Sequence, residues 1–164
     1  YTKRHPRIDL EAIDSSAPML TLLTADIPWV TPVVSKIEDL PPAPRTADIV
    51  CMMYVLQFIQ SDADKLKALR WAYETLKSGG VLILGQKDTV TDTYAGMFAD
   101  EYMRFRVRNG YTLGEIAAKT AALKISMWPT SPAWLEDMCI QAGFIDYAVT
   151  SRWLQFSTSV CTKR

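Results

Sequence analysis

Residues 47–54 read Ala-Asp-Ile-Val-Cys-Met-Met-Tyr, and residues 76–84 read Leu-Lys-Ser-Gly-Gly-Val-Leu-Ile-Leu. Each stretch contains an apolar run of strand length, and a charged stretch with helical period joins them. This order of strand, helix and strand is typical of a parallel sheet. We therefore predict a βαβ unit over residues 47–87 and an α/β fold organised around it.

The connecting helix has recognisable signals at both ends. Ser61 is a candidate N-cap, and Asp64 would complete a capping box. Gly79 is predicted to be the left-handed residue just after the helix, because it has no Cβ to clash. Four residues recur at three- and four-residue steps and therefore share one helix face: Leu66, Leu69, Tyr73 and Leu76.

Further strands and helices are predicted on both sides of this unit. The upstream elements are a strand over 7–14, a helix over 15–23 and a strand over 33–37. The downstream elements are helices over 94–108, 113–125 and 132–142, then strands over 145–149 and 153–160 with a turn or bulge near Ser151. Ser131 is the expected N-cap of the third helix, and Gly143 is expected just past its end. The helices within about 92–127 read as an insertion into a single domain that spans residues 1–164.

Composition limits the classes of function. Lysine plus arginine and aspartate plus glutamate both number 18, so no net charge attracts the whole chain to nucleic acid or to an anionic membrane. No apolar run approaches the roughly 20 residues that span a bilayer. Cys51, Cys139 and Cys161 are scattered without metal-ligand spacing, which predicts reduced thiols in an intracellular compartment and no metal site.

The order of elements and several short motifs carry a resemblance. A strand that ends in an acid, a βαβ unit with a Lys-Ser-Gly-Gly turn and a final β-hairpin resemble the class I S-adenosylmethionine-dependent methyltransferases. Within that superfamily the chain is most similar to the carboxy-S-adenosylmethionine synthases, which prepare the cofactor used to modify the wobble uridine of certain tRNAs. The motifs are Leu56-Gln57-Phe58, the turn at 76–80, Gln86-Lys87, Arg108-Asn109-Gly110-Tyr111, Glu115-Ile116, Lys119 and Ala142-Gly143-Phe144.

The resemblance implies a Rossmann-like fold, with a mostly parallel sheet and a C-terminal antiparallel hairpin. Family members begin with a central strand and a glycine-rich loop that this chain does not contain. That strand would lie beside the strand at 47–54, and its absence would leave backbone groups unpaired. We therefore expect that further chain precedes Tyr1 or that another segment fills this place, and that residues 1–164 alone do not form a stable closed domain.

The resemblance also implies S-adenosylmethionine as cofactor and places residues at its site. Asp14 matches the acid that binds the ribose hydroxyls, and Ser15 follows it, although both also suit an N-cap for the next helix. Ile37 matches a family residue beside the adenine, but Lys36 replaces the preceding aspartate and cannot accept a hydrogen bond. At the end of the strand at 47–54, Met53 replaces an asparagine.

Tyr54, which follows Met53, is also a predicted cofactor residue, and a second group of residues is predicted for the substrate or partner side. Tyr54 and Tyr111 would line a substrate mouth, or else pack in the core. Thr120, next to Lys119, replaces the arginine that pairs with the extra carboxylate of carboxy-S-adenosylmethionine. Three arginines, with Lys119 and Lys124 nearby, offer a contact for RNA or protein, although a solvated helix face is the favoured interpretation: Arg104, Arg106 and Arg108.

Three functions stay open. The chain belongs to an active S-adenosylmethionine-dependent transferase, to a carboxy-S-adenosylmethionine synthase acting on prephenate, or to a methyltransferase-fold module that has lost its cofactor and serves in an RNA–protein assembly. Lys36, Met53 and Thr120 favour a weakened cofactor site. The resemblance implies a homodimer formed through the insertion helices, and no catalytic residue is predicted.

Overall fold

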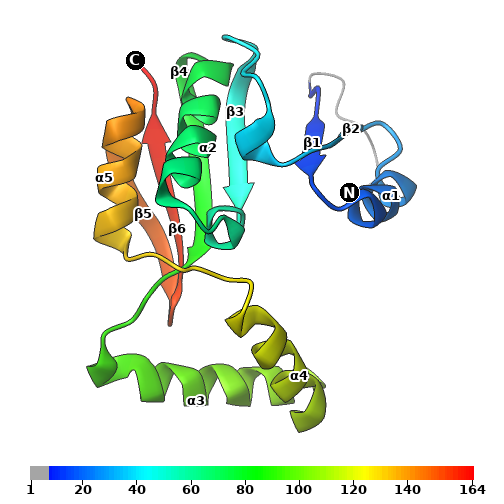
Figure 1. Cartoon of the computed structure of the whole chain (residues 1–164), viewed down its shortest axis with the longest axis vertical. Coiled ribbons are helices and arrows are strands. Elements are labelled where there is room, and N and C mark those ends of the chain that lie inside the picture. The colour runs from blue at the N-terminus through cyan, green and yellow to red at the C-terminus, as the bar shows by residue number, and fades with distance from the viewer. Residues whose placement is uncertain (1–7) are drawn as a thin grey trace. The chain divides into compact units, whose positions relative to one another are not determined.

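The computed structural model describes residues 8–164, apart from the side chain of Asp92 (Figure 1). The chain forms two compact units, residues 1–42 and residues 43–164. We describe each unit by itself, and the expected single domain over 1–164 stays a prediction. Among the described residues, no helix is both long and apolar enough to cross a membrane.

The first unit is a small parallel β–α–β arrangement. Strand β1 (Glu11–Asp14) pairs with β2 (Thr31–Val34), and helix α1 (Ala17–Asp26) connects them. The strand and helix predicted at 7–14 and 15–23 are therefore present with different ends, and Arg7 lies outside the described residues.

The strand predicted over 33–37 is wrong in its limits. β2 begins two residues earlier, and Ile37 lies in a 3₁₀ turn, η1 (Ile37–Asp39). β1 determines these limits, because its last carbonyl, that of Asp14, accepts a hydrogen bond from the Ser35 amide at 3.1 Å. Pro32 is tolerated within β2 because the described residues pair this strand on one side only.

The second unit contains a four-stranded sheet in the order β3-β4-β6-β5. β3 (Ala47–Met53) and β4 (Leu76–Lys87) are parallel, and helix α2 (Asp62–Thr75) joins them. The predicted βαβ unit is confirmed. Within the described residues β3 pairs only with β4, so the identity of a strand beside its other edge stays a prediction.

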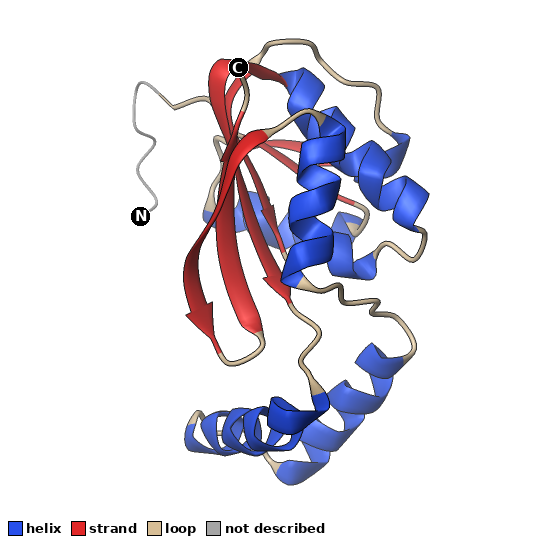
Figure 2. Ribbon diagram, turned by 90° about the vertical axis from the view of Figure 1, so that its left-hand side faces the viewer, coloured by secondary structure: helices blue, strands red, loops and turns tan. Residues whose placement is uncertain are grey.

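The hydrophobic core of this unit lies beneath two helices. α2 and α5 (Pro132–Ala142) lie next to each other on one face of the sheet (Figure 2). Ala68 and Leu69 of α2 and Leu135 and Cys139 of α5 are fully buried. The expected capping signals at Ser61, Ser131 and Gly143 are all present: both serine hydroxyls accept a backbone N–H, and Gly143 has φ +109°.

The end of α2 differs from the prediction for Gly79. The helix ends at Thr75, and Leu76 is already extended and lies opposite Ala47 of β3. Gly79 does have a positive φ of 77°, but it lies within β4. Lys163 occupies the place of a C-terminal cap, because its Nζ donates to the carbonyls of Tyr73 at 2.6 Å, Leu76 at 2.7 Å and Glu74 at 3.4 Å.

The C-terminal hairpin is longer than expected. β5 (Ile145–Trp153) and β6 (Phe156–Thr162) are antiparallel, and only two residues separate them. The strand predicted over 153–160 is therefore wrong at its start, because Trp153 ends β5 and pairs with Phe156. The irregularity predicted near Ser151 is confirmed as a register shift between Val149 and Ser151.

The predicted helical insertion is also present. α3 (Asp92–Arg108) and α4 (Leu113–Lys124) follow β4, and Thr112 and Glu115 form a capping box at the start of α4. A parallel bridge between Asp88 and Thr130 joins the two ends of this insertion. Figure 2 shows the loop that leads from β4 to α3 and the loop that leads from α4 to α5.

Candidate ligand-binding cleft

A large cleft lies within the second unit, between the insertion helices, the β5–β6 hairpin and the ends of β3 and β4. Its volume is about 1580 Å³. The carboxyl ends of parallel strands are the usual position of ligand sites in open α/β sheets. The lining residues include Tyr54, Lys87, Arg106, Lys119, Trp153 and Gln155.

The backbone after β3 brings Tyr54 to the cleft. Tyr54 has φ +61°, in the left-handed region that few residues other than glycine adopt. Its N–H donates to the carbonyl of Gly85 in β4 at 2.6 Å, which extends the parallel pairing by one residue. The two strands therefore hold the unusual conformation, and such conformations are common beside ligand sites.

Aromatic rings form one wall of the cleft. Phe105 and Tyr102 of α3 meet Trp153 and Phe156 of the hairpin, with ring centroids 4.8 Å apart for Phe105–Trp153 and 5.0 Å apart for Tyr102–Phe156. Trp153 remains 42% exposed and Phe105 remains 39% exposed. These rings therefore join the insertion to the hairpin and still present free apolar surface.

Positive charge gathers at the cleft without acidic partners. Arg106 places its guanidinium carbon 4.4 Å from the centre of the Tyr102 ring and donates to the Thr120 hydroxyl at 3.4 Å. The pKa of Lys87 is lowered, first by burial and second by the positive charge of Arg106. Lys119 and Lys124 add two further cations, and the residues that line the cleft include no aspartate or glutamate.

Two buried polar atoms near the cleft have no hydrogen-bond partner among the described residues. They are Nε of Arg106 and Oε1 of Gln155. Gln155 is only 6% exposed. Buried polar atoms are rarely left unpaired, because each loses its hydrogen bonds to water. Both atoms belong to residues that line the cleft.

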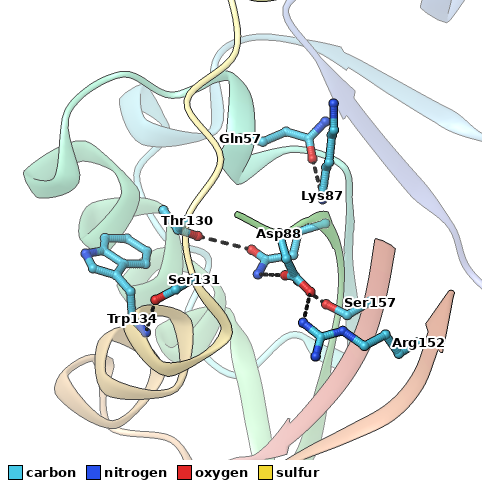
Figure 3. Close-up of polar contacts among 9 residues, drawn as sticks. Gln57, Lys87, Asp88, Thr130, Ser131, Trp134, Arg152 and Ser157 are labelled. Carbon is cyan, nitrogen blue, oxygen red and sulfur yellow. Dashed lines mark hydrogen bonds and ion pairs between the residues drawn. The ribbon is translucent and has the colours of Figure 1, made fainter. Parts of the chain in front are cut away.

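A buried polar cluster supports the hairpin and the two ends of the insertion (Figure 3). The Asp88 carboxylate is completely buried and accepts hydrogen bonds from Gln86 at 2.6 Å, Arg152 at 2.9 Å and Ser157 at 3.0 Å. Thr130 donates to the other end of the Gln86 amide at 3.4 Å. The cluster joins β4, the hairpin and the segment that leads into α5.

A second polar contact positions Lys87. The side-chain oxygen of Gln57 accepts the Lys87 amide at 2.7 Å (Figure 3). The Gln57 carbonyl accepts the amide of Trp128 at 2.7 Å. Gln57 lies in a short 3₁₀ turn, η2 (Leu56–Phe58). This turn therefore fixes both the end of β4 and the return from the insertion.

The structure brings together one predicted cofactor residue, Tyr54, and some of the predicted substrate or partner residues. Tyr54, Lys119 and Thr120 line the cleft. Tyr111 is 46% exposed and does not line it. Arg104 and Arg108 are also outside it, because both pair with Glu101 on the surface of α3, at 3.9 Å and 2.7 Å.

The predicted cofactor residues divide between the two units. In the first, the Asp14 carboxylate accepts the Ser16 amide at 2.7 Å through Oδ1, which leaves Oδ2 for other partners; Ser15 and Ile37 lie in the same unit. In the second, the Met53 side chain covers Gly85 so closely that a Cβ there would lie 2.5 Å from its Cε.

These residues fit S-adenosylmethionine only in part. Asp14 offers a free carboxylate oxygen, but Lys36 and Met53 supply neither the acceptor nor the amide that the family pattern has at those positions. We therefore derive no chemical step through the cofactor.

Several residues that line the cleft are not among the site residues that the sequence predicts. Lys87, Trp153 and Gln155 were not chosen as site residues. Lys87 had a usable signal, since it ends a strand of a parallel sheet. Trp153 and Gln155 had none, because their position depends on the hairpin turn that the sequence pattern misplaced.

Comparison with known proteins assigns the chain to a class. Residues 2–84, half of the chain, match the family model described as a methyltransferase domain. The chain therefore belongs to the S-adenosylmethionine-dependent methyltransferase family, whose cofactor is the one that the resemblance implied.

Particular relatives narrow this assignment. The chain is 30% identical to the carboxy-S-adenosyl-L-methionine synthase of Geobacter metallireducens, over 96% of this chain and 67% of that protein. It is 29% identical to the enzyme of the same name from Citrifermentans bemidjiense, with the same coverage. The chain thus spans about two thirds of the length of these relatives.

A solved structure confirms the fold class. The chain aligns with a methyltransferase of this class from Thermotoga maritima with a TM-score of 0.64 and 18% identity, over 94% of this chain and 73% of that one. The predicted Rossmann-like α/β fold with a C-terminal antiparallel hairpin is therefore confirmed.

Proposed function

We propose that this chain is part of a methyltransferase-family protein related to carboxy-S-adenosylmethionine synthase, active in tRNA modification, whose cofactor site is weakened. The relationship to the synthases supports the first element, and the resemblance to their role in wobble-uridine modification supports the second. The observation that carries the third is the position of Met53, whose thioether lies over Gly85 where the family pattern places an amide.

Two further substitutions support the weakened site. Lys36 is exposed and offers only donors at a position where the adenine amino group needs an acceptor. Thr120 donates its hydroxyl to the carbonyl of Ile116 at 2.7 Å, so its own hydrogen bond is used within α4. A hydroxyl also lacks the charge and the paired donors with which arginine binds a carboxylate.

Calorimetry on the full-length protein tests this proposal. We expect binding of S-adenosylmethionine weaker than micromolar, because several polar contacts are lost. The Met53→Asn variant should bind about tenfold more tightly, the equivalent of one hydrogen bond of ~1.4 kcal/mol.

Met97→Asn is the matched control, since Met97 is also an exposed methionine but belongs to α3. It should leave the affinity unchanged. Micromolar binding by the unmodified protein would contradict the weakened site.

The second candidate function is a non-catalytic interaction module that pairs through its insertion helices. The observation that favours it is apolar exposure on α3 and after it: Met97 is 59% exposed, Val107 is 47% exposed and Leu113 is 66% exposed. Association through the insertion would remove these exposed apolar side chains from water.

Sedimentation velocity of the full-length protein tests the pairing. We expect a dimer that Met97→Glu dissociates, because the new carboxylate would lose its hydration at an apolar interface. Met19→Glu is the control, since Met19 is 57% exposed and lies in the first unit. A monomer at all concentrations, or equal dissociation by both variants, would rule out pairing through α3.

A further inference from the structure

The charge of the cleft is one-sided. Lys87, Arg106, Lys119 and Lys124 line it, whereas none of the described carboxylates does. Among the described residues none of these four cations takes part in an ion pair. Arginine and lysine on a surface usually have acids as neighbours, as Arg104 and Arg108 have Glu101. A cleft with four cations and no acid therefore selects an anionic ligand.

The innermost cations are close enough to influence each other. The positive charge of Arg106 contributes to the lowered pKa of Lys87, and both side chains are half-buried. An anionic group between them would relieve this repulsion and satisfy the unpaired Nε of Arg106. Gln155 Oε1 is ready to accept a hydrogen bond from a ligand N–H or hydroxyl.

The apolar walls of the cleft suit flat rings. The aromatic side chains come from three places in the chain and remain partly exposed, as Tyr54 at 43% and Trp153 at 42% illustrate. The ring of Trp153 is nearly parallel to that of Phe156, at 15°, with centroids 5.9 Å apart. Stacking on such rings accepts any nucleobase, since every base has a π face.

The volume of the cleft and the charges at its edge favour a strand with repeated phosphates over one small molecule. The volume of about 1580 Å³ exceeds the roughly 300–1,000 Å³ of ordinary small-molecule sites. Lys119 and Lys124 are exposed on α4, so positive charge continues outward from the Lys87–Arg106 pair. Phosphates repeated along a strand match this arrangement, whereas a single carboxylate uses only the inner pair.

We propose that this cleft binds a short segment of single-stranded nucleic acid, with a phosphate between Lys87 and Arg106 and bases on the aromatic wall. The proposal goes beyond the proposed function, because preparing a cofactor for tRNA modification does not by itself require a contact with RNA. The RNA contact is therefore assigned to Lys87 and Arg106, which lack acidic partners, and no longer to the exposed Arg104 and Arg108.

Fluorescence anisotropy with a labelled hexauridylate tests the proposal on the full-length protein. We expect saturable binding at 50 mM salt. In Arg106→Gln, the slope of the logarithm of the binding constant against the logarithm of the salt concentration should fall in magnitude by about 0.7, the value of one phosphate contact on a single strand. The affinity of this variant should fall tenfold or more. Lys119→Gln, at an exposed position that leaves folding intact, should reduce the affinity and the slope in the same direction.

Arg104→Gln is the matched control on the same helix and should bind as the unmodified protein does. Equal losses in Arg104→Gln and Arg106→Gln, or no binding of the hexamer, would overturn the proposal. Uridine monophosphate that binds as tightly as the hexamer would show a site for a free nucleotide, and phenylacetate that binds while hexauridylate does not would show a site for a small aromatic acid. Either result would also overturn it.

A parallel titration with S-adenosylmethionine keeps the two proposals separate. Hexamer binding with no cofactor binding supports the cleft and the weakened site together. Micromolar cofactor binding without hexamer binding contradicts both, each by its own measurement. Because the cofactor contains a base but no phosphate, adenosine serves as the control for stacking alone.

Discussion

Replacing Asp88 with alanine is expected to lower the free energy of unfolding by about 3 kcal/mol. The carboxylate is completely buried and accepts from Gln86, Arg152 and Ser157. Its removal leaves the Gln86 amide and the Ser157 hydroxyl buried without their partner. The loss stays near the lower end for a buried charge because the Arg152 side chain is 52% exposed and regains water.

Urea denaturation followed by circular dichroism measures this loss. Asp48→Ala is the control, because Asp48 is 79% exposed and pairs with Lys77 at 2.9 Å on the surface. Exposed pairs contribute at most about 1 kcal/mol. If the two variants lose equal stability, the buried cluster does not stabilise the fold as described.

Replacing Lys163 with methionine is expected to cost a similar amount, about 3 kcal/mol. Methionine keeps the apolar stem but removes the ammonium that donates to the carbonyls of Tyr73, Glu74 and Leu76. The carbonyls at the end of α2 then lack a donor in a place where Lys163 itself is only 9% exposed. The C-terminal turn of α2 should therefore exchange its amide hydrogens sooner than the rest of the helix.

Hydrogen exchange and urea denaturation check this result together. Lys77→Met, in the exposed pair with Asp48, is the control and should change the stability by less than about 1 kcal/mol. Unaltered exchange at the end of α2 in Lys163→Met would contradict the capping role. A loss of stability without altered exchange there would assign the effect of Lys163 to packing.

Local signals explain which elements the sequence predicted well. Ser61, Ser131 and Gly143 announce helix ends through their own side chains or backbone freedom, and the structure confirms them. The apolar runs around α2 likewise needed only their length and order to indicate a βαβ unit.

The misplaced limits depend on distant partners. The last carbonyls of α2 are satisfied by Lys163, almost ninety residues away, so the helix ends before the glycine that appeared to end it. β2 takes its limits from β1, and Trp153 belongs to β5 because Phe156 faces it across the turn. No window of neighbouring residues contains this information.

The candidate site likewise contains residues that the sequence predicts and residues whose role depends on distant partners. Tyr54, Lys119 and Thr120 were chosen through the family resemblance, and the structure places all three in the cleft. Gln155 is not predicted, because its lack of a partner appears only when the whole cleft is assembled. Lys87 is not predicted either, although its place at the end of a parallel strand is a usable signal. The spacing of Arg104 and Arg108 makes them candidates for an RNA or protein contact, but Glu101 on the same helix pairs with both.

The bridge between Asp88 and Thr130 has a consequence for how the insertion can change in evolution. Because the chain leaves the sheet and returns to it at hydrogen-bonded neighbours, residues 89–129 begin and end at one point. A segment attached in this way can be lengthened, shortened or exchanged as a cassette, and a short turn could close the gap. A change in the length of the helices that line the cleft would thus leave the pairing of β4 with the hairpin unaltered.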